Sequence, residues 1–324
     1  MSGQSNDVFP FFVSCGRSGS TLIRSMFDSH PEIAIPGESY FISKLLPRRK
    51  IYEADGFNTA RFLDDVVGLS WTKRDDVPTW IEAWGMDPEA LRQNVLEAHP
   101  RTYPDAIRAV YQSYANWQGK RLYGDKTPAY IKDMGQIAKL LPEARFVHLV
   151  RDGRNVALAF LDAPFGPWTI EEIALHWRSR VLAGRETGAR LGPSRYMEVR
   201  YEDLVERPEE NLAKICDWIG VSFSIEMLDH RASARNISHQ FEHAHQSVLQ
   251  PVKKGVRDWR SKMDRATLGR FELIAGGVLD DFGYERSEMN PGPGKRLISA
   301  SRRTYLEGKK VYRRMRKLDS AQWW

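Results

Sequence analysis

The 324-residue sequence predicts an α/β protein, in which a parallel β-sheet is flanked by helices on both faces. Three short β-favouring runs, at residues 8–14, 145–150 and 196–199, are separated by stretches in which apolar residues recur at helical spacing. Strands that alternate with helices form parallel sheets, because each crossover helix covers one face of the sheet. Such strands are short and mainly apolar because both faces are buried.

The elements are expected in a definite order. The first strand ends at a Gly-rich turn, a helix follows over residues 21–29, and a short second strand is expected at 34–36. Helical spacing over residues 131–141 precedes the strand at 145–150. Three later helices are predicted. The first starts with a capping box at Thr169, the second runs from Pro208 to a final glycine, and the third is capped by Asp264. They begin at Thr169, Pro208 and Asp264 and end near Leu191, Gly220 and Leu279, respectively.

The chain is expected to contain a single α/β domain over residues 1–294, followed by a basic tail over 295–324. Residues 47–120 interrupt the strand–helix alternation and are predicted to form a helical, Trp-rich insertion. Its tryptophans are Trp71, Trp80, Trp84 and Trp117. Two readings are open: the aromatic residues pack the insertion itself, or the insertion forms a wall of the pocket for a substrate.

Composition and charge exclude several classes of protein. Hydrophobic residues make up 42% of the sequence, and no apolar run approaches the ~18 residues of a membrane span. The first residues do not resemble a signal peptide, and two cysteines fit a reducing compartment, so a cytoplasmic location is expected. The net charge of +6 comes from the tail, which holds ten basic and two acidic residues and leaves the rest at −2. This balance does not favour a nucleic-acid-binding face.

The turn after the first strand, Gly16-Arg17-Ser18-Gly19-Ser20-Thr21, is typical of an anion cradle. Glycines let the backbone turn tightly, and the N–H groups that open the following helix point at the anion. The turn is not a Walker A loop, because Ser20 stands where that motif has lysine. A tight turn with a surface arginine is the simpler alternative.

Five segments, in order along the chain, resemble the motifs of the sulfotransferases that use 3′-phosphoadenylyl sulfate (PAPS). The likeness is to the bacterial type, and the motifs are most similar to those of the tyrosylprotein sulfotransferases. The segments are GRSGST at 16–21, YGDKTP at 123–128, LVRDGR at 149–154, RYEDL at 200–204 and KKGVRDW at 253–259. The resemblance implies a P-loop-like fold, PAPS as co-substrate and PAP as product, with no metal.

The resemblance also implies binding roles for individual residues. The backbone of Ser18, Gly19, Ser20 and Thr21, with the Arg17 side chain, would hold the 5′-phosphosulfate. Arg151 would bind the 3′-phosphate, and Tyr201 would contact the adenine. The closing loop would contribute Lys253, Lys254 and Gly255.

One position departs from the family pattern. Ala159 stands where the family usually has a serine that donates to the 3′-phosphate. Loss of a hydrogen bond to a charged group costs about 1.5–3 kcal/mol. Arg154, Ser18 or the closing-loop lysines are candidates to compensate for it.

Sulfuryl transfer needs a base near the acceptor hydroxyl and cations near the leaving oxygen. By resemblance, Glu38 is the general base, and Lys126 and Arg17 stabilise the leaving group; the simpler alternatives are a polar loop residue and surface charges. The expected acceptor is a hydroxyl of a small molecule, natural product or glycolipid. Two other functions stay open: an ATP-dependent kinase or phosphotransferase of the P-loop type, and a nucleotide-binding relative without catalytic activity.

Two further features bear on partners. His239, His243 and His245 are close in sequence, but no carboxylate or Cys pattern completes a metal site, so no metal is expected.

In the tail, Ile298, Tyr305, Tyr312 and Met315 recur at helical spacing among basic residues. Such a helix could lie on an anionic membrane as a peripheral contact; the alternatives are a solvated tail or one docked on a neighbouring subunit of an oligomer.

Overall fold

The computed structural model describes residues 8–70, 78–163, 169–229 and 258–287. Its central sheet contains β1 (Phe9–Ser14), β4 (Ala144–Val150) and β5 (Tyr196–Arg200) in the order β1-β4-β5. All neighbours are parallel, with Phe11 opposite Phe146 and Val147 opposite Met197. The predicted α/β class with a parallel sheet is therefore confirmed.

A second parallel pair extends the sheet beyond β1. It consists of β2 (Ile33–Ala34) and β3 (Leu122–Tyr123). Asp125 joins this pair to β1, because its N–H donates to the Pro10 carbonyl (2.9 Å) and its carbonyl accepts from the Phe12 N–H (2.8 Å). β2 was expected at 34–36, and β3 was not predicted, since two residues are too few to show a strand period.

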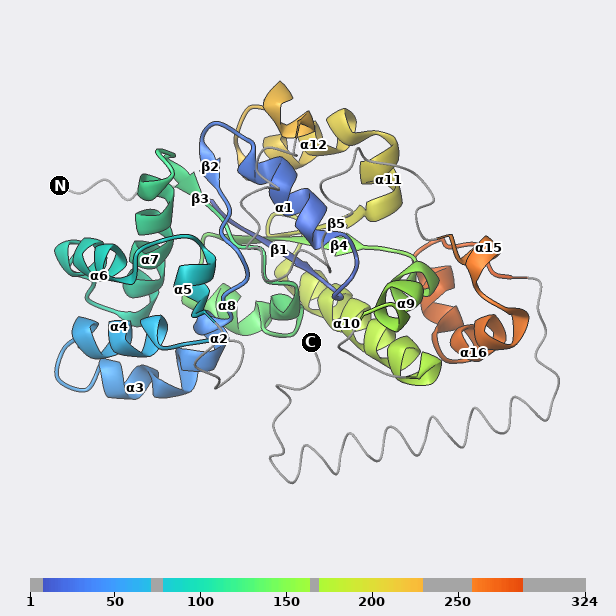
Figure 1. The fold of residues 1–324 in the computed structure, drawn as a ribbon, viewed down its shortest axis with the longest axis horizontal. Coiled ribbons are helices and arrows are strands. Elements are labelled where there is room, and N and C mark those ends of the chain that lie inside the picture. Colours follow the sequence, from blue (N-terminus) through green and yellow to red (C-terminus); the bar gives the residue numbers. More distant parts are fainter. Residues whose placement is uncertain (1–7, 71–77, 164–168, 230–257, 288–324) are drawn as a thin grey trace.

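Helices cover both faces of the sheet (Figure 1). One face carries α1 (Ser20–Asp28), α11 (Tyr201–Glu206) and α12 (Pro208–Ile219), and the other carries α8 (Met134–Leu140) and α10 (Ile170–Leu191). Alternate side chains of β1 enter different cores: Phe12 packs with α1 and α12, whereas Phe9 and Phe11 lie in the largest core on the opposite side. The predicted capping box of Thr169 and Glu172 is present at the start of α10.

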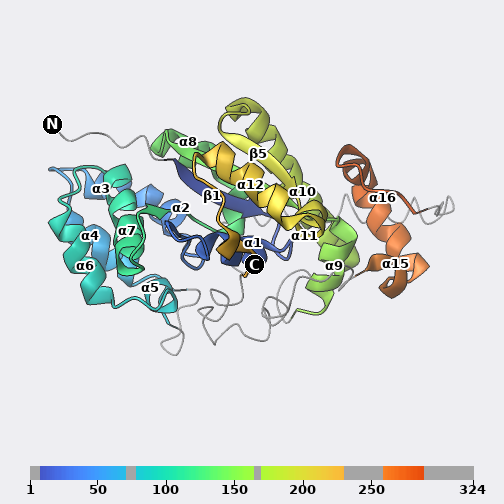
Figure 2. The same cartoon turned by 90° about the horizontal axis from the view of Figure 1, so that it is seen from above.

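The two ends of the molecule are helical (Figure 2). One end contains α9 (Gly153–Leu161), α15 (Trp259–Lys262) and α16 (Arg265–Asp281), and α16 packs along α10. Short 3₁₀ helices complete the described chain at Leu46–Arg48, Pro128–Lys132 and Ile225–Leu228.

The other end is formed by α2 (Phe41–Leu45), which precedes the region predicted to be helical, and by the helices of residues 47–120. The latter are α3 (Arg49–Tyr52), α4 (Thr59–Val67), α5 (Trp80–Ala83), α6 (Pro88–Glu97) and α7 (Tyr103–Trp117). Trp80 and Trp84 are buried in the same core as Phe9, whereas Trp117 is 49% exposed and Trp71 lies outside the described residues. Within the described ranges, no helix has both the length and the apolar character needed to cross a membrane.

Candidate active site

The turn between β1 and α1 has the backbone of an anion cradle. Arg17 and Gly19 both have positive φ, of 66° and 92°, and α1 begins directly after them at Ser20. A Cβ on Gly19 would lie 2.3 Å from the ring of Tyr201. Glycine is therefore required twice here, by the left-handed backbone and by the close approach of Tyr201.

The residues of this turn fit an anionic ligand. Ser18 is only 1% exposed, and within the described part of the chain its Oγ has no hydrogen-bond partner. Ser20 and Thr21, in the first turn of α1, are also buried. A buried donor without an acceptor is costly, and the N-terminus of a helix attracts negative charge. A phosphate or sulfate oxygen would satisfy both conditions.

Arg151 lies beside the same turn, after the carboxyl end of β4. Its guanidinium lies 4.4 Å from the centre of the Tyr201 ring, and its Nη1 donates to the Arg17 carbonyl at 3.4 Å. The indole of Trp177 on α10 donates to the Arg151 carbonyl at 3.1 Å. The structure thus brings Arg17, Gly19, Arg151 and Tyr201 together, as the motifs predicted.

Glu38 and Lys126 form an ion pair at the same edge of the sheet. Lys126 Nζ lies 2.7 Å from Glu38 Oε1, and the Tyr40 hydroxyl donates to Glu38 Oε2 at 2.8 Å. The two residues follow β2 and β3, whose parallel pairing places their carboxyl ends side by side. The strand that the sequence analysis missed is therefore the one that brings Lys126 to Glu38.

Buried polar residues form a hydrogen-bond network next to the ion pair. Asp125 Oδ2 accepts hydrogen bonds from the Tyr111 hydroxyl (2.7 Å) and the Thr127 hydroxyl (3.0 Å). The Thr127 hydroxyl in turn accepts from the Ser39 N–H at 3.4 Å, which links the segments that carry Lys126 and Glu38. Sequence reasoning missed this network; the Asp within YGDKTP was its only local signal, because Tyr111 is far away in the chain.

Burial controls the protonation of two members of the network. It raises the pKa of Asp125 to about 7, although hydrogen bonds from Tyr111 and Thr127 lower it in part. The pKa of Tyr40 is raised well above its usual value, first by burial and then by the neighbouring Glu38. Tyr40 therefore stays protonated and acts as a donor to Glu38.

Arg154 does not fit the compensating role that the sequence suggested. It is fully buried, and its guanidinium donates to both Asp152 oxygens, to Glu272 Oε1 (2.7 Å) and to the Glu285 carbonyl (2.8 Å). The ring of Trp259 covers its face at 3.7 Å. Through these contacts Arg154 holds α9 against α15 and α16. Its guanidinium is therefore not available to bind a phosphate.

Some predicted residues fall outside the described ranges. They are Lys253, Lys254 and Gly255 of the closing loop and the three histidines at 239, 243 and 245. Ala159 is buried on α9. Within the ranges that the structure describes, no group of three or more His, Cys, Asp and Glu side chains could hold a metal ion.

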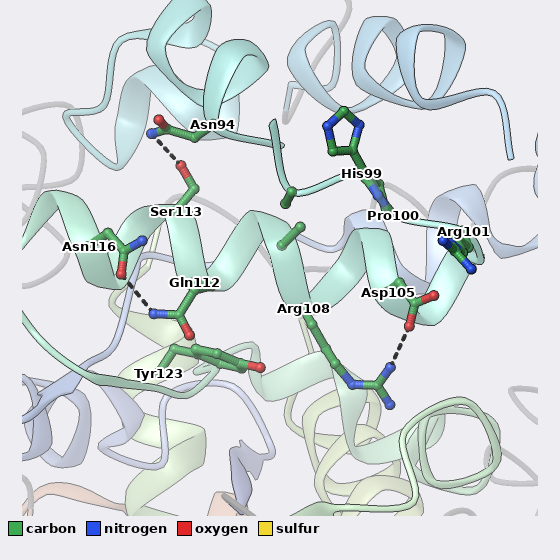
Figure 3. A pocket seen from close by; sticks show the side chains of 12 residues that line it. Asn94, His99, Pro100, Arg101, Asp105, Arg108, Gln112, Ser113, Asn116 and Tyr123 are labelled. Atoms are coloured by element: carbon green, nitrogen blue, oxygen red, sulfur yellow. Dashed lines mark hydrogen bonds and ion pairs between the residues drawn. The ribbon is translucent and has the colours of Figure 1, made fainter. Parts of the chain in front are cut away.

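A hollow of about 440 Å³ lies against α6 and α7 (Figure 3). Its polar side chains bond to one another: Asn94 to Ser113 (3.0 Å), Gln112 to Asn116 (2.8 Å) and Arg108 to Asp105 (3.1 Å). None of the predicted site residues lines it. The predicted site residues therefore lie apart from the lining of this hollow.

Comparison with known proteins identifies the family of the chain. A family model described as the sulfotransferase family matches residues 10–224, and a sulfotransferase domain model matches 172–283. Protein-tyrosine sulfotransferase 2 of Gallus gallus is 25% identical over 295 residues, covering 88% of this chain and 71% of the relative. Protein-tyrosine sulfotransferase 1 of Danio rerio is 22% identical, covering 88% and 74%.

Solved structures show the same fold. The sulfotransferase domain from the Synechococcus PCC 7002 olefin synthase superposes with a TM-score of 0.58 at 22% identity, covering 89% of this chain and 99% of that one. The sulfotransferase domain from the curacin biosynthetic pathway gives 0.59 at 19% identity, covering 87% and 99%. The chain thus belongs to the sulfotransferase family, and the predicted enzyme class, a PAPS-dependent sulfotransferase, is confirmed.

Proposed function

We propose that this enzyme transfers the sulfuryl group of PAPS to an acceptor hydroxyl, with Glu38 as general base and with Lys126 and Arg17 stabilising the leaving group. The observation that carries the proposal is the 2.7 Å ion pair between Lys126 and Glu38 at the edge of the sheet where β1 leads into the anion cradle. A carboxylate and a cation are thereby held next to each other beside an anion site, as sulfuryl transfer requires.

The donor would be held by groups at the ends of β1 and β4. The N–H groups of Ser18, Gly19, Ser20 and Thr21 and the Arg17 side chain would bind its 5′-phosphosulfate. Arg151 would bind the 3′-phosphate, for which a guanidinium fork is well suited. Tyr201, which touches both Gly19 and Arg151, would lie against the adenine, and Lys253, Lys254 and Gly255 would close over it. PAPS, when bound, supplies the sulfuryl group and a stable phosphate leaving group.

The step is an in-line displacement. A bond forms between the acceptor oxygen and sulfur while the bond between sulfur and the bridging phosphate oxygen breaks, and its electron pair stays on the phosphate of PAP. Glu38 takes the acceptor proton. Lys126 and Arg17 stabilise the charge that grows on the bridging oxygen, which requires Lys126 to turn from Glu38 toward the donor. The Tyr40 hydroxyl keeps Glu38 oriented during that exchange.

The acceptor is proposed to be a hydroxyl of a small molecule, natural product or glycolipid. The sulfotransferase fold does not fix the acceptor, because function depends on the site grafted onto a fold. The helices at residues 47–120, whose Trp84 indole donates to the Gly37 carbonyl at 2.9 Å, reach the segment that carries Glu38 and are proposed to form one wall of its pocket.

The activity test is an acceptor screen with PAPS, in which the sulfated product is identified by its mass. Glu38→Gln and Lys126→Ala should each lower kcat by more than ~10²-fold, because each removes a group that acts in proton transfer or charge stabilisation. Glu186→Gln, at an exposed carboxylate paired with Arg190 at 2.8 Å, is the matched control and should keep full activity.

Near-normal turnover by folded Glu38→Gln and Lys126→Ala proteins would contradict these assignments. A thermal-shift titration with PAP against ATP and Mg²⁺ decides between the sulfotransferase and a kinase. Binding of PAP without transfer to any hydroxyl would indicate a relative that has lost turnover.

A further inference from the structure

Arg180 is a nearly buried cation on α10, near the ion pair of Glu38 and Lys126. It is 9% exposed, and its Nη1 lies 2.8 Å from Nδ1 of His176, one helical turn earlier. A guanidinium only donates hydrogen bonds, so Nδ1 of His176 accepts and the ring is in its neutral form. The neighbour that binds Arg180 therefore does not balance its charge.

Within the described ranges, no carboxylate forms an ion pair with Arg180, in contrast to the buried Arg154 and the partly exposed Arg185. Arg154 has Asp152 and Glu272, and Arg185 on the same helix has Glu198. Burial lowers the pKa of Arg180, whose titratable neighbours include Cys15 and Tyr40. Both are themselves neutral, because burial raises the pKa of Cys15 to about 12 and raises that of Tyr40 strongly. A buried charge normally has an anionic partner.

The position of Arg180 indicates where that partner would come from. Arg180 lies one helical turn before Gly184, which packs against Ile131 of the 3₁₀ helix Pro128–Lys132 that follows Lys126. The ring of Tyr130 in that 3₁₀ helix lies 6.2 Å from the ring of Tyr40, whose hydroxyl donates to Glu38. In Figure 1, α10 runs beneath the end of β1. His176 packs its ring on Phe160, which approaches Gly16 of the cradle. Arg180 thus lies on the Glu38 side of the cradle, whereas Arg151 and Tyr201 lie on the side assigned to the donor.

We propose that Arg180, supported by His176, binds an anionic group of the acceptor, so that the acceptor is a hydroxyl compound that also carries a carboxylate or phosphate. This inference rests on the proposed sulfuryl transfer and names the class of its acceptor. The guanidinium fork matches the two oxygens of such a group, and the neutral His176 holds the fork in place from its other side.

The test uses the full-length protein and pairs of hydroxy compounds that differ only in charge: 4-hydroxyphenylacetate with its amide, and 3-hydroxyoctanoate with its amide. Binding is measured by calorimetry and thermal shift, with and without saturating PAP. The wild-type protein should prefer at least one acid over its amide. Arg180→Met should weaken binding of that acid by about 10- to 100-fold and leave the amide unchanged, because it removes a charge-assisted hydrogen bond.

Two control variants accompany it. Arg180→Lys should keep part of the preference, since it keeps the charge but not the fork. Arg190→Met, at an exposed position of the same helix, should behave as wild type. Without ligand, Arg180→Met should unfold at or above the wild-type temperature, because an uncompensated buried charge has been removed.

The proposal is overturned if the wild type binds each acid and its amide equally, or if the preference survives Arg180→Met. It is also overturned if Arg180→Met weakens PAPS binding but not PAP binding, since Arg180 would then contact the transferred group. Failure of the proposed function would give a different result: PAP would not bind, or no sulfated product would form.

Discussion

At the scale of single residues, Gly19 controls whether the cradle can form. Its φ of 92° belongs to the left-handed region, and the Tyr201 ring fills the space that a side chain would need. Tyr201 also lies under the guanidinium of Arg151. A change at position 19 therefore displaces the ring that joins the predicted 5′- and 3′-phosphate sites, so both should be lost together.

Gly19→Ala is expected to reduce PAP binding by more than about tenfold, the effect of ~1.4 kcal/mol. The variant combines left-handed strain of about 1–2 kcal/mol with the clash against Tyr201. Gly220→Ala is the matched control, because Gly220 is also left-handed, with φ 84°, but a Cβ there meets nothing within 4 Å. Calorimetric titration with PAP should show a loss for Gly19→Ala only, and an equal loss in both variants would contradict the role of Tyr201.

At the scale of elements, the β2–β3 pair brings Glu38 and Lys126 together, although each strand has only two residues. The longer strands and the capped helices were predictable because period, capping and end signals repeat over many residues. The cradle was predictable because its residues are contiguous. The approach of Lys126 to Glu38 was implied only by resemblance, since a separation of 88 residues carries no local signal. Arg180 was missed for the same reason: its environment comes from Cys15, Tyr40 and His176 on three separate segments.

The segment after β3 should make the stability of the protein depend on pH through Asp125. Burial raises its folded pKa to about 7, above the 3.8 of an unperturbed carboxyl. Because the folded value is the higher one, the stability that protonated Asp125 provides is complete below about pH 4 and is lost as the pH rises to about 7.

Asp125→Asn should remove this loss, because the amide stays neutral and its oxygen still accepts from Tyr111 and Thr127. Urea unfolding at intervals between pH 4 and 8 is expected to show a smaller fall in the free energy of unfolding for this variant than for the wild type. Asp217→Asn, at an exposed position, is the control and should follow the wild-type curve. Parallel curves for all three proteins would show that Asp125 does not titrate in this range.

At the scale of the whole molecule, the charge is divided between the catalytic part and the tail. Residues 1–294 carry a net charge of −2, so the anion site depends on a few placed cations and not on a general positive field. Residues 295–324 carry +8 and lie outside the described ranges. We propose that this tail makes a peripheral contact with anionic membranes.

The full-length protein is expected to sediment with vesicles that contain phosphatidylserine and to be released by salt, because each basic residue near such a surface contributes about 1 kcal/mol. Truncation after Gly294 should abolish sedimentation without changing PAP affinity. Neutral phosphatidylcholine vesicles are the control. Equal sedimentation of the truncated and full-length proteins would rule out the tail as the contact.

Helix α10 carries residues that lie on the proposed donor side and on the proposed acceptor side of the site. Trp177 donates to the carbonyl of Arg151 on the side proposed for the donor, and the bonded pair of His176 and Arg180 lies on the side proposed for the acceptor. Inserting or deleting a single residue turns everything beyond it by about 100° around the helix axis. A length change between 177 and 180 would thus remove Arg180 from the site, whereas substitution at 176 or 180 alters only the acceptor half. In this enzyme, new acceptors are therefore accessible through point substitutions in α10 and not through changes in its length.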